Sequence, residues 1–489
     1  MGVRASRLRT VGLLAGVLVA CKPPPAPPLP PTPDPPGTSA GLKARYSAVL
    51  EEGNILSVQV DATDGAFSRL TIESGAEVFL SELEAGPAGE ATTPVAKLRW
   101  PLDLPVCKSA CTVKYRFDLG RVAEAFQNPQ WAERHDDAIL APATTWLVRP
   151  IQPGEGSFEL AVDVPSGHSF VSGLRRGDDG VYRARLDDLP QAPYAAFGRF
   201  DVRTIRLGKR EVEWVRIGNA PQIGDDPLEG WVTRAAQDVA SYFGKFPTER
   251  ALVIVLVEPG RAITEGTALG NGGASIIVHV GENIKGTALA GDWILTHEMV
   301  HLSMPGLASR HRWMEEGFAT YIEPVARAQM GRLPPDEVWA EWYNGMRKGQ
   351  PLDGEGGLDG TDRWGRIYWG GAAFWLMAEV AIAQETDGKK GLRDCLRAVV
   401  AEGGTIDKRW SVRKFLGVCD AIVGKPVVQG LYDQVASEAV EIDLESLFSR
   451  LGVRKSLLGI VLDDKAPEAL VRKSILAPAR ADVPRPARL

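Results

Sequence analysis

The feature that most constrains this chain is a pair of histidines four residues apart, in the stretch His297-Glu298-Met299-Val300-His301. In a helix, this spacing places both imidazoles on one face, with Glu298 beside them. Two histidines can hold a zinc ion, and the glutamate can accept a proton from a water at that ion. The flanks, Trp293 to Leu295 and Leu302, are apolar. We therefore predict a largely buried helix whose polar side chains need partners.

An acidic stretch that follows a short loop offers the third ligand. It reads Glu315-Glu316-Gly317-Phe318-Ala319, and fourteen residues separate His301 from Glu316. The two glutamates point about 100° apart on a helix, so only one of them can face the metal. His311 lies in the intervening loop, where a solvated side chain is a simpler interpretation than an extra ligand.

These two stretches resemble the gluzincin zinc peptidases, in the branch of aminopeptidase N-like and glycyl aminopeptidase-like enzymes. In that family, His-Glu-x-x-His is followed one helix later by Asn-Glu-Gly-Phe-Ala, whose glutamate is the third ligand. The resemblance implies one zinc ion per chain, held by His297, His301 and Glu316, with Glu298 as the general base. Glu315 then takes the place of the family's asparagine.

A second resemblance lies downstream, where Tyr368-Trp369-Gly370-Gly371-Ala372 is similar to the segment that carries the family's catalytic tyrosine. It implies that the Tyr368 hydroxyl stabilises an oxyanion during catalysis. Glu323 follows Glu316 by seven residues and shares its helical face. It is a candidate for supporting a ligand histidine, and a surface carboxylate near Pro324 is the equal alternative.

One departure concerns substrate binding. Aminopeptidases of this branch carry a Gly-x-Met-Glu-Asn strand whose glutamate binds the free amine of the substrate, whereas this chain has Gly270-Asn271-Gly272-Gly273-Ala274-Ser275. We expect the backbone of Gly272, Gly273 and Ala274 to bind substrate as an edge strand, because glycine permits close approach. Without the glutamate, the choice between exopeptidase and endopeptidase stays open.

The 489 residues predict an α+β protein of several domains, because the hydrophobic periodicity changes along the chain. Residues 41–215 read as a β-sandwich-like domain. The resemblance implies a thermolysin-like catalytic domain over 216–345, followed by a helical domain over 346–455 that completes the active site. Residues 456–489 are expected to form a tail.

The N-terminus resembles a bacterial lipoprotein signal over residues 1–20, since a basic start and a short apolar run end in Leu18-Val19-Ala20-Cys21. Lipidation would fall on Cys21, and a plain secretory signal is the alternative. Ten prolines lie between residues 22 and 37, so residues 21–40 read as an extended tether. By resemblance to lipoprotein sorting, Lys22 points to the outer membrane, on its periplasmic or cell-surface side.

Export changes the interpretation of the remaining four cysteines. In an oxidising compartment, an even number suggests two disulfides, Cys107–Cys111 and Cys395–Cys419. A metal site at the first pair is the weaker alternative, because no second pair with ligand spacing accompanies it. A net charge of −6 and the absence of a Lys/Arg-rich run argue against nucleic acid as a partner.

The sequence therefore predicts a zinc metallopeptidase with a lipid anchor in the membrane and a peptide or protein as its substrate. The alternative is a non-catalytic binding or assembly lipoprotein that reuses the peptidase fold. Such a scaffold would have no use for Glu298. A zinc hydrolase that acts on another kind of bond is the third interpretation, since an open coordination position is chemically general.

Overall fold

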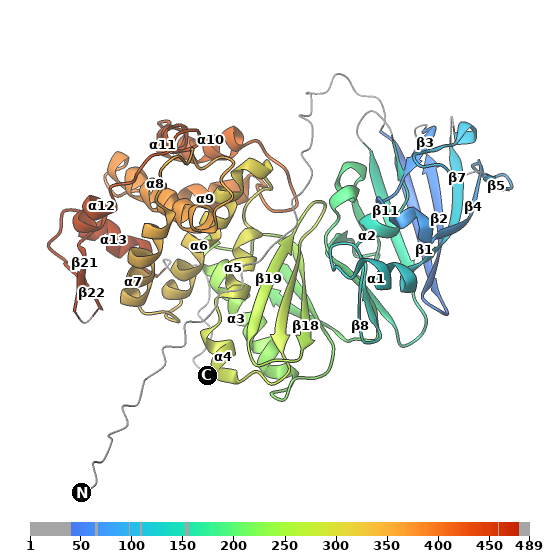
Figure 1. The fold of residues 1–489 in the computed structure, drawn as a ribbon, viewed down its shortest axis with the longest axis horizontal. Coiled ribbons are helices and arrows are strands. Elements are labelled where there is room, and N and C mark those ends of the chain that lie inside the picture. Colours follow the sequence, from blue (N-terminus) through green and yellow to red (C-terminus); the bar gives the residue numbers. More distant parts are fainter. Residues whose placement is uncertain are drawn as a thin grey trace, which may run out of the picture.

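Three parts of the chain lie side by side in the computed structural model: strands in blue to teal, a central green sheet, and orange to red helices (Figure 1). The structure describes residues 41–63, 67–96, 98–107, 110–151, 156–457 and 459–478. The predicted signal peptide, Cys21 and the tether lie outside the described residues. Among the helices that are described, none is long and apolar enough to cross a membrane.

The N-terminal part is built on an eight-stranded sheet. Residues of β1 alternate strictly between exposed and buried, as expected for a strand with one face on a core. This strand pairs antiparallel with β2 and parallel with β11. The strand order is β13 (Arg175–Arg176), β14 (Tyr182–Arg185), β11 (Ser157–Asp163), β1 (Lys43–Glu51), β2 (Ile55–Thr63), β7 (Cys111–Asp118), β4 (Leu80–Pro87) and β5 (Thr93–Pro94).

Two smaller sheets and two short helices complete this part. The rings of Trp146, Phe170 and Phe197 meet in its core. A disulfide joins Cys107 to Cys111 at the start of β7. The first of these sheets has the strand order β12 (Ser169–Ser172), β15 (Ala195–Gly198), β9 (Ala138–Leu140) and β8 (Glu133–His135). The second has the order β10 (Arg149–Pro150), β3 (Arg69–Thr71) and β6 (Leu102–Asp103). The helices are α1 (Leu119–Phe126) and α2 (Ala143–Trp146).

The central sheet has parallel strands in its middle and an antiparallel strand at each edge. Seven consecutive residues of β18 are buried, as expected for a strand covered on both faces. The edge strand β19 lies beside α5. The strand order is β16 (Val202–Leu207), β17 (Arg210–Ile217), β18 (Arg250–Glu258), β20 (Ser275–Gly281) and β19 (Ile263–Leu269); the neighbouring helices are α3 (Asp225–Phe243), α4 (Gly286–Gly291), α5 (Ile294–His301) and α6 (Arg312–Gln329).

The C-terminal part is almost entirely helical and packs on α6 through α8. A second disulfide, Cys395–Cys419, joins α9 to α10. The elements are α7 (Pro335–Gly345), a π-helical turn (Arg366–Gly370), α8 (Gly371–Glu385), α9 (Leu392–Ala401), α10 (Val412–Val423), α11 (Val427–Val435), α12 (Leu444–Leu451), β21 (Val453–Ser456), β22 (Gly459–Leu462) and α13 (Ala469–Leu476).

The loop between α9 and α10, residues 402–411, touches all three parts, and we refer to it as the strap loop. Its Ile406 N–H donates to the carbonyl of Leu302 just after α5, over 3.2 Å. Its Lys408 carbonyl accepts from the Gly306 N–H over 2.9 Å. On the other side, Asp407 forms an ion pair with Arg175 of β13. The strap loop thus connects the helical part to α5 and to the N-terminal part.

The expectation of a mixed α and β protein with several sheets and many helices is confirmed. The predicted tail is wrong in its first half, because residues 456–489 include β22 and α13. Ile475 and Leu476 of α13 are buried at 4% and 8% exposure, and Gln329 donates to the Ile475 carbonyl over 2.8 Å. An amphipathic helix this short gives little periodicity to detect.

Candidate metal centre

Helix α5 begins at a side-chain cap and presents two histidines. The Asp292 carboxylate accepts hydrogen bonds from the backbone N–H groups of Ile294 and Leu295, each over 3.1 Å, and so satisfies donors of the first turn. One turn apart on this helix, the rings of His297 and His301 have centroids 5.0 Å apart. The predicted spacing therefore does place both imidazoles on one face.

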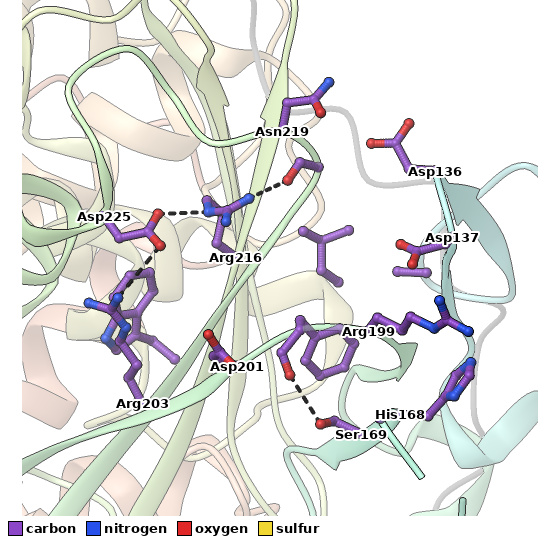
Figure 2. A pocket seen from close by; sticks show the side chains of 16 residues that line it. Asp136, Asp137, His168, Ser169, Arg199, Asp201, Arg203, Arg216, Asn219 and Asp225 are labelled. Atoms are coloured by element: carbon purple, nitrogen blue, oxygen red, sulfur yellow. Dashed lines mark hydrogen bonds and ion pairs between the residues drawn. The ribbon is translucent and has the colours of Figure 1, made fainter. Parts of the chain in front are cut away.

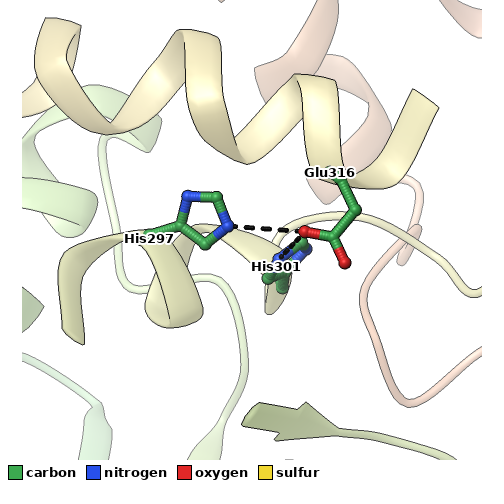
Figure 3. Close-up of side chains that lie close together, drawn as sticks. All are labelled: His297, His301 and Glu316. Carbon is green, nitrogen blue, oxygen red and sulfur yellow. Dashed lines mark ion pairs between the residues drawn. The ribbon is translucent and has the colours of Figure 1, made fainter. Parts of the chain in front are cut away.

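Helix α6 brings Glu316 to these histidines, as Figure 3 shows. The distance from Glu316 Oε2 to His297 Nε2 is 3.5 Å, and to His301 Nε2 it is 3.6 Å. One donor atom from each of the three residues lies within 4.8 Å of the others. Solvent still reaches the cluster, since 15% of the His301 side chain and 17% of the Glu316 side chain remain exposed.

The donor set and its spacing fit zinc. Two imidazole nitrogens and one carboxylate oxygen form a recognised catalytic set that leaves a fourth position open. Ligand bonds of about 2.0–2.2 Å in a tetrahedron place neighbouring donor atoms roughly 3.4 Å apart. The observed 3.5 and 3.6 Å match that edge, and they are too long for good N–H···O hydrogen bonds, which cluster near 2.9 Å.

The three side chains interact strongly even without a metal. Burial alone would lower the pKa of His301, but the negative charge of the adjacent Glu316 carboxylate raises that pKa to about 9. Burial alone would raise the pKa of Glu316, but the two histidines hold it well below its usual range. A metal ion that binds here must therefore displace a proton from His301.

Glu298 lies beside the cluster and is buried, with 6% of its surface exposed. Burial raises the pKa of its carboxyl group, while His301 and His297 act in the opposite direction. The backbone of Ala268 in β19 provides a hydrogen bond that also favours the ionised form. A carboxylate in such a position is suited to accept a proton.

Glu315 faces away from the cluster and has a different partner. Its Oε1 accepts a hydrogen bond from the Leu307 N–H over 2.8 Å, so the side chain supports the loop before α6. Burial raises the pKa of Glu315 to about 7. Of the two adjacent glutamates, Glu316 is therefore the one that meets the histidines.

Tyr368 in the π-helical turn stands next to the cluster. Its ring stacks on that of His297, with centroids 6.3 Å apart and planes 21° apart. On its other side it stacks on Trp364, with a centroid distance of 5.2 Å. π-Helical turns are frequent at functional sites. The structure thus brings together all five residues that the sequence singled out for catalysis and metal binding.

Two further candidates have partners outside the cluster. Glu323 Oε1 accepts a hydrogen bond from Arg327 over 2.7 Å, and within the described residues no hydrogen bond joins it to His297 or His301. Glu323 is therefore neither the support of a ligand histidine nor a surface carboxylate, because it is a buried member of an ion pair, 4% exposed. His311 is 1% exposed and its Nδ1 lies 2.9 Å from Asp359 Oδ1.

The expectation that Gly272, Gly273 and Ala274 bind substrate is contradicted. Their backbone groups are used within the chain: Gly272 accepts from Arg175 N–H over 3.1 Å, and Ala274 N–H donates to Gly173 over 2.8 Å. A Cβ on Gly273 would stand 1.9 Å from the Gly173 carbonyl oxygen. This turn is a junction with the N-terminal part, and its glycines allow two backbones to meet.

The segment beside Glu298 is the edge strand β19. A Cβ on Gly266 would lie 2.6 Å from Glu298 Cγ, so glycine is needed for this close approach. From the N-terminal part, the Tyr194 side chain makes hydrogen bonds with Thr267 of β19 and with Gln130, while burial raises the pKa of its phenol. These residues could not be predicted from the sequence, since no local pattern links them to the histidines.

A cavity of about 630 Å³ lies elsewhere, where the β8–β9 hairpin and β12 meet β16 and β17 (Figure 2). Arg216 donates to Asp225 over 2.7 Å, and Arg203 lies 3.6 Å from the same carboxylate. Three charged residues of its lining are thus paired with one another, and none of the candidate zinc ligands belongs to it. The cavity is separate from the metal centre.

Comparisons with known proteins show what the fold is similar to. No family model matches the chain, and no curated protein matches it. Among solved structures, an aminopeptidase N family protein from Idiomarina loihiensis superposes with a TM-score of 0.59 at 14% identity, covering 86% of this chain and 80% of that one. A mutant of a two-domain M1 zinc metallopeptidase, bound to L-arginine, superposes with a TM-score of 0.50 at 16% identity. That match covers 83% of this chain and 95% of the other. At these identities the likeness concerns the fold.

Proposed function

We propose that the protein is a zinc-dependent peptidase, with His297, His301 and Glu316 as the metal ligands and one zinc ion per chain. The observation that carries the proposal is the meeting of three donor atoms within 4.8 Å, beside the buried Glu298. The likeness of the fold to zinc metallopeptidases supports it. The exported, lipid-anchored state and the peptide substrate belong to the same proposal.

The metal site, Glu298 and Tyr368 each have a separate chemical role in this proposal. Zinc at this site would polarise a peptide carbonyl and acidify a water to a pKa near 7. Glu298 accepts the proton of the attacking water and passes it to the leaving amine. The Tyr368 hydroxyl donates a hydrogen bond to the carbonyl oxygen as negative charge develops on it. Burial of Glu298 shields the proton transfer from bulk water.

Zinc stoichiometry of the purified full-length protein, measured by elemental analysis, is the first test. We expect about one zinc per chain, lost in His297→Ala and Glu316→Ala. Glu315→Ala is the matched control, because that residue precedes Glu316 but faces the loop; zinc should remain. Absence of zinc even after reconstitution contradicts the proposal.

Glu298→Gln then separates an enzyme from a scaffold. The variant should keep its zinc but lose roughly 10²- to 10⁴-fold of its peptide hydrolysis, the range expected for loss of a general base. A zinc-loaded parent that cleaves nothing in a broad peptide library would favour the non-catalytic alternative. Equal rates in parent and variant would assign any cleavage to a contaminant.

A further inference from the structure

One buried arginine carries more hydrogen-bond donors than the described part of the chain pairs. Arg366 begins the π-helical turn, and 2% of its side chain is exposed. Its Nη2 donates to the carbonyl of Gly356 over 3.1 Å. Its Nε and Nη1 are buried and have no hydrogen-bond partner among the described residues. These two nitrogens carry three N–H groups, and a buried charge without partners is destabilising.

The carboxylate beside Arg366 is bound by another arginine. Glu355 Oε2 lies 3.6 Å from Arg366 Nη1, which is too long for a good hydrogen bond. Arg363 donates to this carboxylate from Nε over 2.6 Å and from Nη2 over 3.1 Å. The Leu352 N–H donates to it over 2.9 Å, and the hydrogen bonds from Arg363 and Leu352 lower the pKa of Glu355 to about 2. One ionised carboxylate therefore balances only one of the two guanidinium charges.

A small cavity adjoins this arginine. Its volume is about 10 Å³, which is room for one small group such as a water or a monatomic ion. Arg366 and Gly370, the two ends of the π-helical turn, both line it. The other lining residues are Gly349, Leu358, Val435, Val440 and Ile442. Arg366 is thus the charged residue of a lining that otherwise consists of glycines and aliphatic side chains.

The cavity and the arginine together select the occupant. A water oxygen has two lone pairs, so it cannot accept from all three N–H groups, and it brings no charge. A monatomic anion can accept from several donors and supplies the missing negative charge. Sulfate, phosphate and the carboxylate of a peptide have several heavy atoms and exceed the volume. A cation would be repelled by the guanidinium group.

We propose that the cavity beside Arg366 is a binding site for a monovalent, monatomic anion such as chloride. The ion contacts both ends of the turn that carries Tyr368, and it contacts Val440 and Ile442 in the segment between α11 and α12. The site is independent of the proposed peptidase function, because none of the candidate zinc ligands lines this cavity.

Thermal unfolding of the purified full-length protein tests the site without any measurement of activity. The protein is unfolded in sodium gluconate and in sodium chloride at equal ionic strength. We expect a melting temperature about 2 °C higher in about 200 mM chloride, because a ligand that binds only the folded state stabilises it. Bromide should act like chloride. General effects of the salts are removed by comparison with variants.

Two variants and one control assign the effect to the cavity. Arg366→Met removes the guanidinium group and should abolish the difference between chloride and gluconate. Gly370→Ala keeps Arg366 but adds a methyl group 3.1 Å from Leu358 Cδ2, within the lining of the cavity, and should abolish the difference as well. Arg413→Met is the matched control, because Arg413 is exposed and pairs with Asp433 away from the cavity. It should respond to chloride as the parent does.

The remaining outcomes overturn the site. A parent protein whose melting temperature is the same in gluconate, chloride and bromide has a water, and no anion, at Arg366. An equal response to chloride in the parent and in Arg366→Met shows that the ion binds elsewhere. If Arg366→Met does not fold, Gly370→Ala decides: loss of the response supports the site, and an unchanged response overturns it.

Discussion

The strand β19 and the turn that follows it are adjacent in the chain but contact different parts of the molecule. Gly266 in the strand lies against Glu298, whereas Gly273 in the turn lies against the backbone of Gly173 in the N-terminal part. Both glycines allow close approach, yet one shapes the metal centre and the other a domain junction. Where a glycine does permit a close approach, the sequence therefore does not indicate which segment comes close.

Replacement of Gly266 should give the largest effect on activity. In Gly266→Ala the new Cβ would press on Glu298, and displacement of a catalytic group by about 1 Å can lower the rate by roughly 100-fold. We expect kcat/KM to fall by about that factor while zinc content stays at one. Gly286→Ala is the control, because nothing lies within 4 Å of its Cβ position. A normal rate in Gly266→Ala would show that β19 does not constrain Glu298.

Replacement of Gly273 should act on stability instead. The Cβ of Gly273→Ala would meet the backbone carbonyl oxygen of Gly173, which can move only with the segment between β12 and β13. We expect the free energy of unfolding to fall by about 1–3 kcal/mol in urea titrations. The rate per folded molecule should be unchanged. If this variant instead lost activity at full stability, the turn would belong to the substrate site after all.

The pH dependence of zinc binding distinguishes the metal centre from the junction. Because the pKa of His301 is raised to about 9 in the metal-free protein, the ring holds a proton at pH 7 that must leave before its nitrogen binds zinc. The apparent zinc affinity should therefore rise roughly tenfold per pH unit up to that pKa and then level off. Chelator competition between pH 6.5 and 8.5 measures the slope. A flat profile would contradict the His301–Glu316 pair.

The ion pair at the junction should have the smallest effect. Arg175 is half-exposed, and the buried Asp407 of the strap loop keeps Thr405 and Lys408 as partners when Arg175 is removed. Arg175→Ala should therefore cost about 1 kcal/mol or less. Urea titration measures the loss, and elemental analysis should find unchanged zinc. A loss as large as that in Gly273→Ala would mean that this ion pair, rather than the backbone contact, holds the junction.

Local periodicity accounts for the parts of the site that the sequence could predict. The two histidines share a helical face because they are four residues apart, and only one of two adjacent glutamates can meet them. In each case the information lies within one element.

Contacts between distant residues account for what the sequence could not predict. β19 is a polar edge strand whose pairing with β20 shifts register between Ile263 and Gly266, so its alternation is weak. Gly273 meets Gly173, 100 residues away along the chain, and Tyr194 meets Gln130 and Thr267, 64 and 73 residues away. The Glu323–Arg327 pair is local, but its burial depends on elements packed around α6. None of these follows from a motif.

The strap loop has a thermodynamic consequence. It is held by α9 and α10, yet its hydrogen bonds reach the residues just after α5 and its Asp407 reaches β13. If the helical part melted, the end of the histidine helix and the domain junction would lose these partners together. The three parts should therefore unfold in one cooperative transition. Zinc bound at α5 and α6 would then add the free energy of its own binding to the free energy of unfolding of the whole chain. The melting temperature of the whole chain would rise as a result.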